Sequence, residues 1–452
     1  MSIELIIISI IFVFGYIAIA TEHSIHIDKT ASALLTGVLV WTVYILSSST
    51  LVDISSLPQW FLDEHSLKDA TEIATTWVSH HQLIESLGEI SSILFFLMGA
   101  MTIVELVDTY GGFSVITDRI KSTSTVKLLW IVGLIAFFLS AALDNLTTTI
   151  VMISLLRKLV SSREDRLFFA GIIVIAANAG GAWSPIGDVT TTMLWIGGQI
   201  SSLNIMKALI LPSLITIIVP LVFLSFTLRG KRVTTPEALP ENIHYQVSAG
   251  QRNLIFSMGM LGLLFVPVFK TITHLPPFMG MLFSMSVLWV VSERMHKKNC
   301  EEVVSAGLHF VTVLKRIDTA SVLFFLGILL AVSALQATGL LASVALGLDK
   351  SVGNMDIIIF LIGLLSSVVD NVPLVAAAMG MYDMVTFPMD HEMWEFLAYA
   401  AGTGGSVLII GSAAGVAAMG MERINFFWYM KVMSPLALMG YVAGAVFYQF
   451  VL

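Results

Sequence analysis

Two stretches of the chain decide its fold, Ser140-Ala-Ala-Leu-Asp-Asn-Leu-Thr147 and Ser366-Ser-Val-Val-Asp-Asn-Val-Pro373. Each places an Asp-Asn pair in the middle of a long apolar run, the first covering 128–156 and the second 356–386. A carboxylate inside an apolar membrane span costs about 2.5–3.5 kcal/mol on insertion scales, so such a residue indicates a functional role. The recurrence of the pair indicates one structural device that is used twice.

The composition around these stretches is that of a polytopic membrane protein. Of the 452 residues, 57% are apolar and only 12% are charged, and the mean hydropathy is +0.90. Soluble proteins carry about 25% charged residues, so this chain has too few polar side chains to cover a surface that faces water. This excludes a soluble enzyme, a nucleic-acid-binding protein and a disordered chain. The single cysteine, Cys300, excludes a disulfide framework or a Cys-rich metal site.

Apolar runs of membrane-spanning length recur along the whole chain. About 20 helical residues cross the hydrocarbon core of a bilayer, and the alternating pattern of barrel strands is absent, so we expect α-helices throughout. The first run has no basic residue ahead of it and no small-residue cleavage site, and we interpret it as a retained helix rather than a signal peptide. The expected spans are 3–20, 31–48, 89–107, 128–156, 167–197, 207–228, 254–270, 278–292, 319–345, 356–386, 396–421 and 425–450.

The distribution of Lys and Arg indicates how these spans are oriented. Four segments are rich in basic residues: 119–127, 157–166, 229–252 and 294–316. Three others hold only Lys68 and Lys350: 49–88, 346–355 and 387–395. By the positive-inside rule the first set is cytoplasmic and the second external, and both termini are external. The runs 128–156 and 356–386 then each enter and return on one side, as re-entrant hairpins of opposite orientation. The alternative is two ordinary helices joined by an unusually short loop.

The two hairpins belong to an internal repeat. Asn178-Ala-Gly-Gly-Ala-Trp-Ser-Pro-Ile-Gly-Asp188 follows the first hairpin and matches Gly402-Thr-Gly-Gly-Ser-Val-Leu-Ile-Ile-Gly-Ser412 after the second. Leu-Phe-Phe-Leu also precedes both hairpins, at 94–97 and 323–326. Three matches in one order indicate a duplication, and inverted repeats of this kind are typical of secondary transporters that bind substrate at the repeat interface. The Gly-Gly pairs predict broken helices around a buried site; small-residue helix packing is the alternative at 411–420.

Four carboxylates within the apolar runs are the candidates for the functional site: Glu105, Asp144, Asp188 and Asp370. Asp144 and Asp370 stand at the hairpin tips, beside amide, hydroxyl and carbonyl oxygens of the kind that hard cations prefer. A site that binds either Na⁺ (or Li⁺) or a proton, but never both, is the simplest basis for antiport. The competing interpretation is a helix cap, in which Asp or Asn binds backbone N–H groups; the two roles can coexist.

Other polar residues supplement these carboxylates. Asn178, Thr190 and Thr191 are expected to join Asp188 in a cation shell or a proton relay, and Glu105 lies at a span end, where snorkelling to the interface is the alternative. The histidines are interpreted as solvated loop residues, with pH sensing as the alternative for one of them: His23, His26, His65, His80 and His81. The phosphate-binding motif Gly-x-x-x-x-Gly-Lys-Ser/Thr is absent, so we expect no nucleotide and no other cofactor.

Residues 95–105, 143–149, 178–191 and 370–373 together resemble the NhaD-type sodium/proton antiporters, part of a superfamily that includes arsenite and citrate or dicarboxylate carriers. The similarity covers most of 89–422. It implies exchange of Na⁺ and Li⁺ for protons, chiefly at alkaline pH, in a bacterial inner membrane. It also implies a homodimer in which a mobile transport domain moves against a scaffold domain by an elevator-like mechanism.

The resemblance also assigns residues and domains. The implied polar positions are Glu105, Asp144, Asn145, Thr147, Asn178, Asp188, Thr190, Thr191, Asp370 and Asn371, and the repeat adds Thr403 and Ser406. The Na⁺ site itself is expected at Asp144, Asn145, Asp370 and Asn371. The expected division is N-terminal scaffold helices with an external loop (1–88), repeat 1 (89–228, hairpin 128–156, broken helix 167–197), a cytoplasmic linker with two helices and an interfacial segment (229–318), and repeat 2 (319–452, hairpin 356–386, broken helix 396–421).

Two other functions compete with antiport. A Na⁺-coupled symporter of a dicarboxylate would bind Na⁺ at the Asp-Asn tips and the anion at the Gly-Gly backbone N–H groups. Against it, nearly all 23 Lys and Arg residues lie in loops, and the tips carry Asp, which repels anions. A channel or passive scaffold is disfavoured by the duplicated hairpins with their intramembrane carboxylates.

Overall fold

The computed structural model describes residues 2–65, 69–117, 122–234, 247–295, 309–368 and 370–451. Within these ranges all regular elements are helices, apart from an isolated bridge between Ser124 and Arg232, and nine helices are long and apolar enough to span a membrane. The prediction of an all-α polytopic membrane protein is confirmed at this level. Cys300 and several of the basic residues used for orientation lie outside the described residues: Lys68, Arg119, Lys121, Lys297 and Lys298.

Helices cover each of the expected spans. The N-terminal elements are α1 (Ile3–Ala20), α2 (Glu22–Ile25), α3 (Lys29–Leu46), α4 (Ser48–Leu51), α5 (Gln59–Glu64), α6 (Ala70–Thr76), a π-helix (Trp77–Gln82), α7 (Leu83–Thr109) and α8 (Ser114–Thr117). They are followed by α9 (Thr125–Leu143), α10 (Asn145–Leu159), α11 (Arg163–Ala182), α12 (Val189–Ile196), α13 (Ser202–Thr227), α14 (Ala249–Thr273), α15 (Pro277–Met295) and α17 (Phe310–Leu314). The last are α18 (Thr319–Ala337), α19 (Leu340–Val352), α20 (Met355–Leu365), α21 (Asn371–Met381), α22 (Glu392–Gly404), α23 (Ala413–Glu422), α24 (Phe426–Val432) and α25 (Ser434–Val451).

The segment 49–88, expected to be a loop, is largely helical. From Ala70 the chain is helical without interruption to Thr109, as α6, the π-helix and α7. Aromatic side chains hold this helical extension in place, because Trp77 packs against Phe61 with 4.9 Å between ring centroids and stacks on His81 at 4.3 Å. The segment was predicted to be a loop because it holds many acidic residues, and charge alone does not indicate this aromatic packing.

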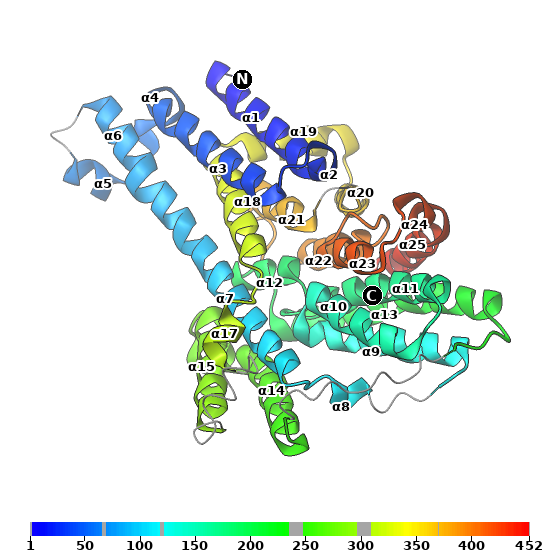
Figure 1. Ribbon diagram of the computed structural model, residues 1–452. Coiled ribbons are helices and arrows are strands. Elements are labelled where there is room, and N and C mark those ends of the chain that lie inside the picture. Colours follow the sequence, from blue (N-terminus) through cyan, green and yellow to red (C-terminus); the bar gives the residue numbers. More distant parts are fainter. Residues whose placement is uncertain are drawn as a thin grey trace. The chain divides into compact units, whose positions relative to one another are not determined.

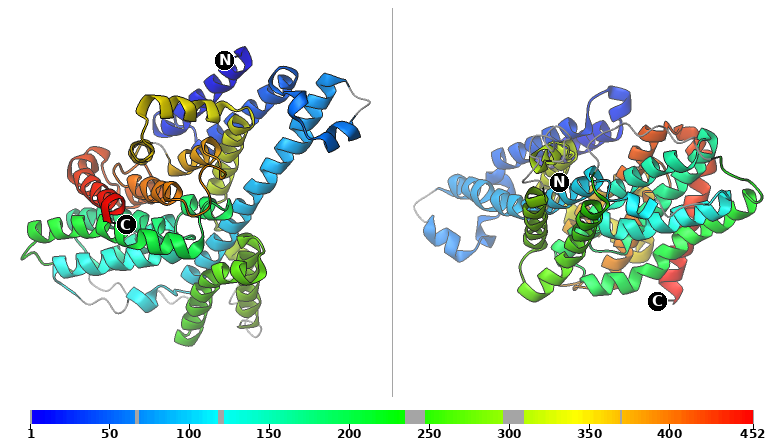
Figure 2. Two further views of the ribbon diagram at one scale, coloured as in Figure 1. Left: turned by 180° about the vertical axis from the view of Figure 1, so that it is seen from behind. Right: turned by 60° about the horizontal axis from the view of Figure 1, so that its bottom comes forward.

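The chain forms two compact units, which are described separately. The first contains residues 1–94, 318–354 and 376–386. Its core is the pair α3 and α18, which lie side by side in Figures 1 and 2. Glycines make this contact close, since a Cβ added to Gly37 would lie 2.6 Å from the carbonyl oxygen of Gly327. Trp41 Nε1 also donates to the carbonyl oxygen of Leu330 at 2.9 Å.

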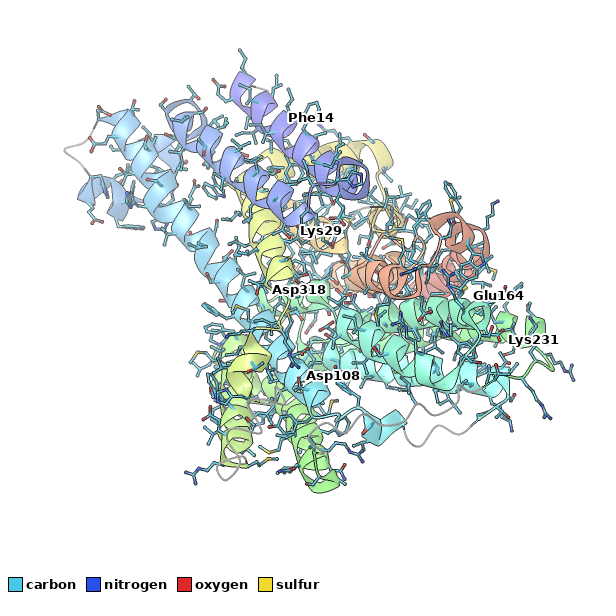
Figure 3. The ribbon with its side chains drawn as sticks, viewed as in Figure 1. Phe14, Lys29, Asp108, Glu164, Lys231 and Asp318 are labelled. Carbon is cyan, nitrogen blue, oxygen red and sulfur yellow. The ribbon has the colours of Figure 1, made fainter. Side chains whose placement is uncertain are left out.

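The second unit contains residues 95–317, 355–375 and 387–452. Helix α11 lies at its centre, buried from Phe169 to Ala182 and in contact with α9, α10, α13, α22 and α23. Side chains fill the space between these helices (Figure 3). Helix α13 packs along α25, where Gly440 leaves room for the backbone of Thr216. Asn178 of the candidate site lies in α11 itself, and Thr403 lies in α22, one of the helices that contact α11.

Both segments that decide the fold consist of two helices with a short break. Asp144 alone separates α9 from α10, with a φ of 95°, and residues 366–370 separate α20 from α21. The Gly-Gly pairs lie where the helices end and the breaks begin. Gly180 and Gly181 are the third-last and second-last residues of α11, and the break follows at 183–188. Gly404 is the last residue of α22, and Gly405 begins the break at 405–412. The lack of a Cβ at Gly180 also permits close packing, because Gly180 lies against the backbone of Phe137 in α9.

The two halves of the second unit repeat the same contacts. Ser140 Oγ donates to the carbonyl oxygen of Ala177 at 2.6 Å, and Ser366 Oγ donates to that of Ala401 at 2.9 Å. Gly187 lies close to the Ser140 carbonyl oxygen, as Gly411 does to that of Ser366. The break after α11 is therefore packed on the end of α9 in the same way as the break after α22 is packed on the end of α20.

Candidate functional site

Asp144 is held at the start of α10 by its own turn. Its Oδ1 accepts from the backbone N–H of Thr147 at 2.8 Å, and its Oδ2 accepts from Thr147 Oγ1 at 2.8 Å. The residue thus caps α10, and one of the two roles considered for it is present in the structure. Each carboxylate oxygen keeps lone pairs beyond these bonds, because a carboxylate has about four acceptor positions.

Asp188 caps the next short helix and is almost completely buried, at 1% exposure. Its Oδ1 accepts from the N–H of Thr190 at 2.9 Å and from Thr190 Oγ1 at 2.8 Å. Its Oδ2 accepts from Asn145 Nδ2 at 2.6 Å, and Asn371 Nδ2 lies 3.4 and 3.5 Å from the two carboxylate oxygens. The asparagines of both Asp-Asn pairs are therefore directed at this one carboxylate.

Asn178 connects the two halves of the site. Its Oδ1 accepts from Asn145 Nδ2 at 3.0 Å, and its Nδ2 donates to Ser406 Oγ at 2.9 Å and to Ser412 Oγ at 2.8 Å. Ser412 in turn caps α23 through the N–H of Gly415. Ser412 was not predicted as a site residue. Its position in the repeat, equivalent to that of Asp188, is the sequence signal that identifies it.

A cavity of about 20 Å³ lies against Asp144 and Asp188. This volume is enough for about one water molecule. Thr192 is the other polar residue in its lining, and the rest of the wall is apolar. Six parts of the chain form that wall: α7, the end of α9, the break after α11, the start of α12, α14 and α15. The apolar residues are Phe96, Leu97, Ala100, Met101, Ala142, Leu143, Ile186, Val189, Leu263 and Met281. We call it the ion cavity; two carboxylates face it, and no basic side chain is part of its described lining.

Several expected site residues lie elsewhere or are engaged by the backbone. Asp370 is half-buried, binds the N–H of Val372 at 3.2 Å, and does not line the ion cavity. Thr191 Oγ1 donates to the Asp188 carbonyl oxygen, and Thr403 Oγ1 to that of Tyr399. Asp188 lies between the two asparagines of the expected Na⁺ set. That set, Asp144, Asn145, Asp370 and Asn371, stays a prediction.

Glu105 lies apart from this network, near the end of α7. Its Oε1 is 3.9 Å from a guanidinium nitrogen of Arg316, and the glutamate side chain is 31% exposed. The carboxyl of Glu105 is partly buried. Among the described residues, none of the hydrogen bonds that join Asn145, Asn178 and Asp188 includes it. Glu105 therefore resembles the interfacial alternative considered for it more closely than a ligand.

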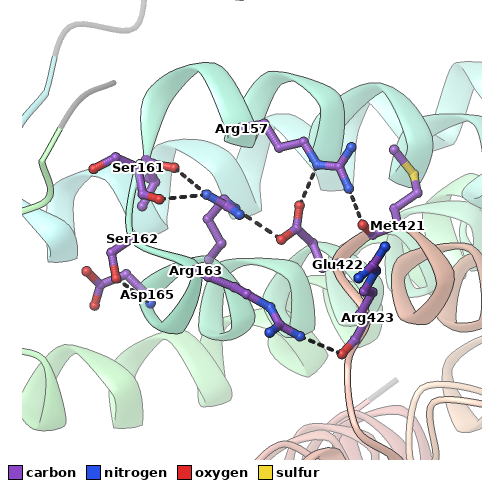
Figure 4. Close-up of polar contacts among 10 residues, drawn as sticks. Arg157, Ser161, Ser162, Arg163, Asp165, Met421, Glu422 and Arg423 are labelled. Atoms are coloured by element: carbon purple, nitrogen blue, oxygen red, sulfur yellow. Dashed lines mark hydrogen bonds and ion pairs between the residues drawn. The ribbon is translucent and has the colours of Figure 1, made fainter. Parts of the chain in front are cut away.

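An ion-pair network around the buried Glu422 joins the end of α10 and the beginning of α11 to the end of α23 (Figure 4). Glu422, with its side chain 2% exposed, binds Arg157 Nε at 2.7 Å and Arg166 Nε at 3.0 Å. Arg157 also donates to the carbonyl oxygen of Met421. We call these residues the Glu422 network. Sequence analysis counted both arginines only as cytoplasmic charges, because the partner lies more than 250 positions away and no local pattern connects them.

Comparison with known proteins places the chain in a family. The family model described as citrate transporter matches residues 16–400. Sodium/proton antiporter 1 of Arabidopsis thaliana is 46% identical over 442 residues, which are 97% of this chain and 71% of that protein. Sodium/proton antiporter 2 of the same plant is 44% identical over 442 residues, 97% of this chain and 98% of that protein.

A bacterial relative extends the similarity. The Na⁺/H⁺ antiporter NhaD of Vibrio cholerae is 30% identical over 464 residues, which cover 97% of this chain and 90% of that protein. The resemblance found from the motifs is thus confirmed over nearly the whole length of the chain. The chain belongs to the NhaD-type sodium/proton antiporter family, within the citrate transporter family, and is a multi-pass membrane transporter rather than an enzyme.

Proposed function

We propose that this protein exchanges Na⁺ or Li⁺ for H⁺ by alternating access, with Asp144 and Asp188 as the carboxylates that bind cation or proton in turn. The observation that carries the proposal is the ion cavity, whose volume of about 20 Å³ fits a single small ion. Its two carboxylates attract cations and repel anions. The antiporter names of the relatives support the same exchange.

Competition at one site would couple the two fluxes. Ionised carboxylates offer oxygen ligands to a hard cation, whereas a protonated carboxyl offers an O–H donor and fewer free lone pairs. Asn145 would orient Asp188, since its Nδ2 donates both to Asp188 Oδ2 and to Asn178 Oδ1, which holds the amide in place. Sodium binding and protonation then exclude each other, and no further coupling device is required.

The matching contacts of the two halves support alternating access. We propose that α9–α12 and α20–α23 are inverted repeats, with 128–156 and 356–386 as re-entrant hairpins and the breaks at 183–188 and 405–412 as the discontinuities. The apolar wall from α7, α14 and α15 would belong to the scaffold against which this body moves, in a homodimer, as the elevator-like mechanism requires. The expected domain division at 88, 228 and 318 and the external termini remain part of this proposal.

The membrane in which the protein works is a separate part of the proposal. The motifs indicate a bacterial inner membrane, and relatives named as antiporters occur in both a plant and bacteria. We propose a membrane across which a proton gradient is maintained, with export of Na⁺ at alkaline pH as the physiological task.

Symport of an organic anion is the second candidate, because the matching family model is described as citrate transporter. An anion of that size would need a larger cavity and cationic or N–H donors facing it. The ion cavity is small and faces two carboxylates, so this candidate requires a different binding place from the one described.

Reconstituted exchange tests the proposal. The full chain is placed in proteoliposomes with a pH-sensitive dye, and proton movement is recorded on addition of Na⁺, Li⁺ or K⁺ at neutral and alkaline pH. We expect Na⁺ and Li⁺ to move protons in the wild type, and Asp144→Asn and Asp188→Asn to abolish the movement while the protein still folds. Asp69→Asn is the control, since Asp69 is an exposed helix cap and Asn caps equally well.

Two results would contradict parts of this assignment. Normal exchange by Asp188→Asn would show that the binding carboxylate lies elsewhere. Absence of exchange with all three cations, together with Na⁺-dependent uptake of a labelled dicarboxylate, would replace antiport by symport.

A further inference from the structure

A second, much larger cavity shares part of its wall with the ion cavity. Its volume is about 590 Å³, and Ala142 and Ile186 line both cavities. Four elements form it: the end of α9, the break between α11 and α12, the beginning of α13, and the C-terminal half of α14. We call it the lateral cavity.

The walls and the floor of the lateral cavity differ in exposure. Its walls carry apolar side chains that are strongly exposed, among them Leu203 of α13 and Ile272 of α14, each at 71%. Its floor is formed by residues that are less than one tenth exposed, including Ala141 at 9% and Ser184 at 5%. A hydrogen bond from Ser184 Oγ to the Ala141 carbonyl oxygen, 2.5 Å long, joins the two parts of the floor.

The exposed walls identify the surroundings of the cavity. Helices α13 and α14 are both long and apolar enough to span a membrane, so their exposed apolar side chains face the acyl chains of the bilayer. The lateral cavity is continuous with that surface through Leu203, Val268 and Ile272. Its lining is almost entirely carbon, and filling such a space with water is unfavourable.

We propose that an acyl chain of a bilayer phospholipid occupies the lateral cavity. The acyl chain enters between α13 and α14 and ends against the floor, where Ala142 and Ile186 also line the ion cavity. An occupied cavity keeps water from the outer side of that partition. The lipid is thereby a structural ligand that borders the ion site without touching Asp144 or Asp188.

Photochemical labelling in a detergent-free bilayer tests this site. The full chain is reconstituted in liposomes that contain a phospholipid with a diazirine on its acyl chain, illuminated, digested and analysed by mass spectrometry. We expect adducts on the floor residues 141–142 or 184–186, which the lipid around the protein cannot reach unless a chain enters the cavity. The readout does not depend on ion exchange, so it stands or falls separately from the proposed function.

Two variants on one helix make the test specific. Met206→Trp adds bulk to the cavity wall, and Leu211→Trp adds the same bulk to an exposed position of α13 that does not line the cavity. We expect loss of the floor adducts in Met206→Trp and their retention in Leu211→Trp, with adducts on the outer surface in both. Adducts confined to exposed side chains, or floor adducts that persist unchanged in Met206→Trp, would overturn the proposal.

Discussion

Asp144 combines a carboxylate that we propose as an ion ligand with an unfavourable backbone conformation. Its φ of 95° and ψ of 162° lie in a region that is essentially restricted to glycine, and a residue held there costs about 1–3 kcal/mol. Glycine at a helix N-cap costs only a few tenths of a kcal/mol relative to Asp. Glycine would therefore be more stable than Asp at this position, and the proposed ion-binding role accounts for a carboxylate there.

We expect Asp144→Gly to melt at a higher temperature than Asp144→Asn, while neither variant exchanges ions. Both substitutions remove the charge, and Gly relieves the strain but loses the side-chain cap that Asn keeps, at a cost of a few tenths of a kcal/mol. A strain of about 1–3 kcal/mol outweighs that loss. Thermal unfolding of the two purified variants, recorded in one detergent, checks this expectation. A lower midpoint for Asp144→Gly would show that Asp144 is not strained.

At the residue scale, most of the polar network could be predicted from the motifs, whereas the pairing of Asp144 with Asp370 stays a prediction. Asn145, Asn178 and Asp188 were selected from the motifs, and the structure joins them by hydrogen bonds. Asp144 and Asp370 were grouped because they occupy equal positions in the repeats. Which carboxylates come together depends instead on how α10, α12 and α21 pack, and that information is absent from a local motif.

At the element scale, glycine sets the distance between α9 and α11. A Cβ on Gly180 would overlap the backbone of Phe137, so the two helices would have to separate. We expect Gly180→Ala to lower the unfolding midpoint clearly and to reduce exchange, because the end of α9 and the break that follows α11 line the ion cavity. Gly420→Ala is the matched control: its Cβ would meet open space within α23, and replacing a helical glycine stabilises by about 1 kcal/mol. Equal midpoints for both variants would contradict the close contact.

The Glu422 network joins elements that are distant in sequence. Removing one partner of a buried ion pair leaves the other charge uncompensated, at a cost of about 3–5 kcal/mol. We expect Glu422→Gln to fall near the low end of this range, because Arg157 is half-exposed and can be solvated. Unfolding midpoints compared with those of Glu164→Gln, an exposed glutamate of α11, check the expectation. An unchanged midpoint in Glu422→Gln would mean that the network contributes nothing to stability.

At the scale of the whole molecule, the sequence predicted the class of fold and the positions of the helices. Long apolar runs suffice for that, because a helix in a bilayer must satisfy its own backbone. The composition of the two units could not be predicted: α3 packs on α18, which the repeat assigns to the second half of the chain. The acidic segment before α7 was mistaken for a loop, since its aromatic packing has no signature in charge.

The charge of the ion cavity has a consequence for the energy source of transport. With two carboxylates and no basic side chain in its described lining, the site is neutral when it holds two protons and carries one negative charge when it holds one Na⁺. A cycle that exchanges these two forms moves net charge, worth about 2.3 kcal/mol per 100 mV. We expect a potassium diffusion potential to change the rate of Na⁺-driven proton movement in proteoliposomes; a rate independent of voltage would contradict it. The membrane voltage, and not the pH difference alone, would then power sodium export.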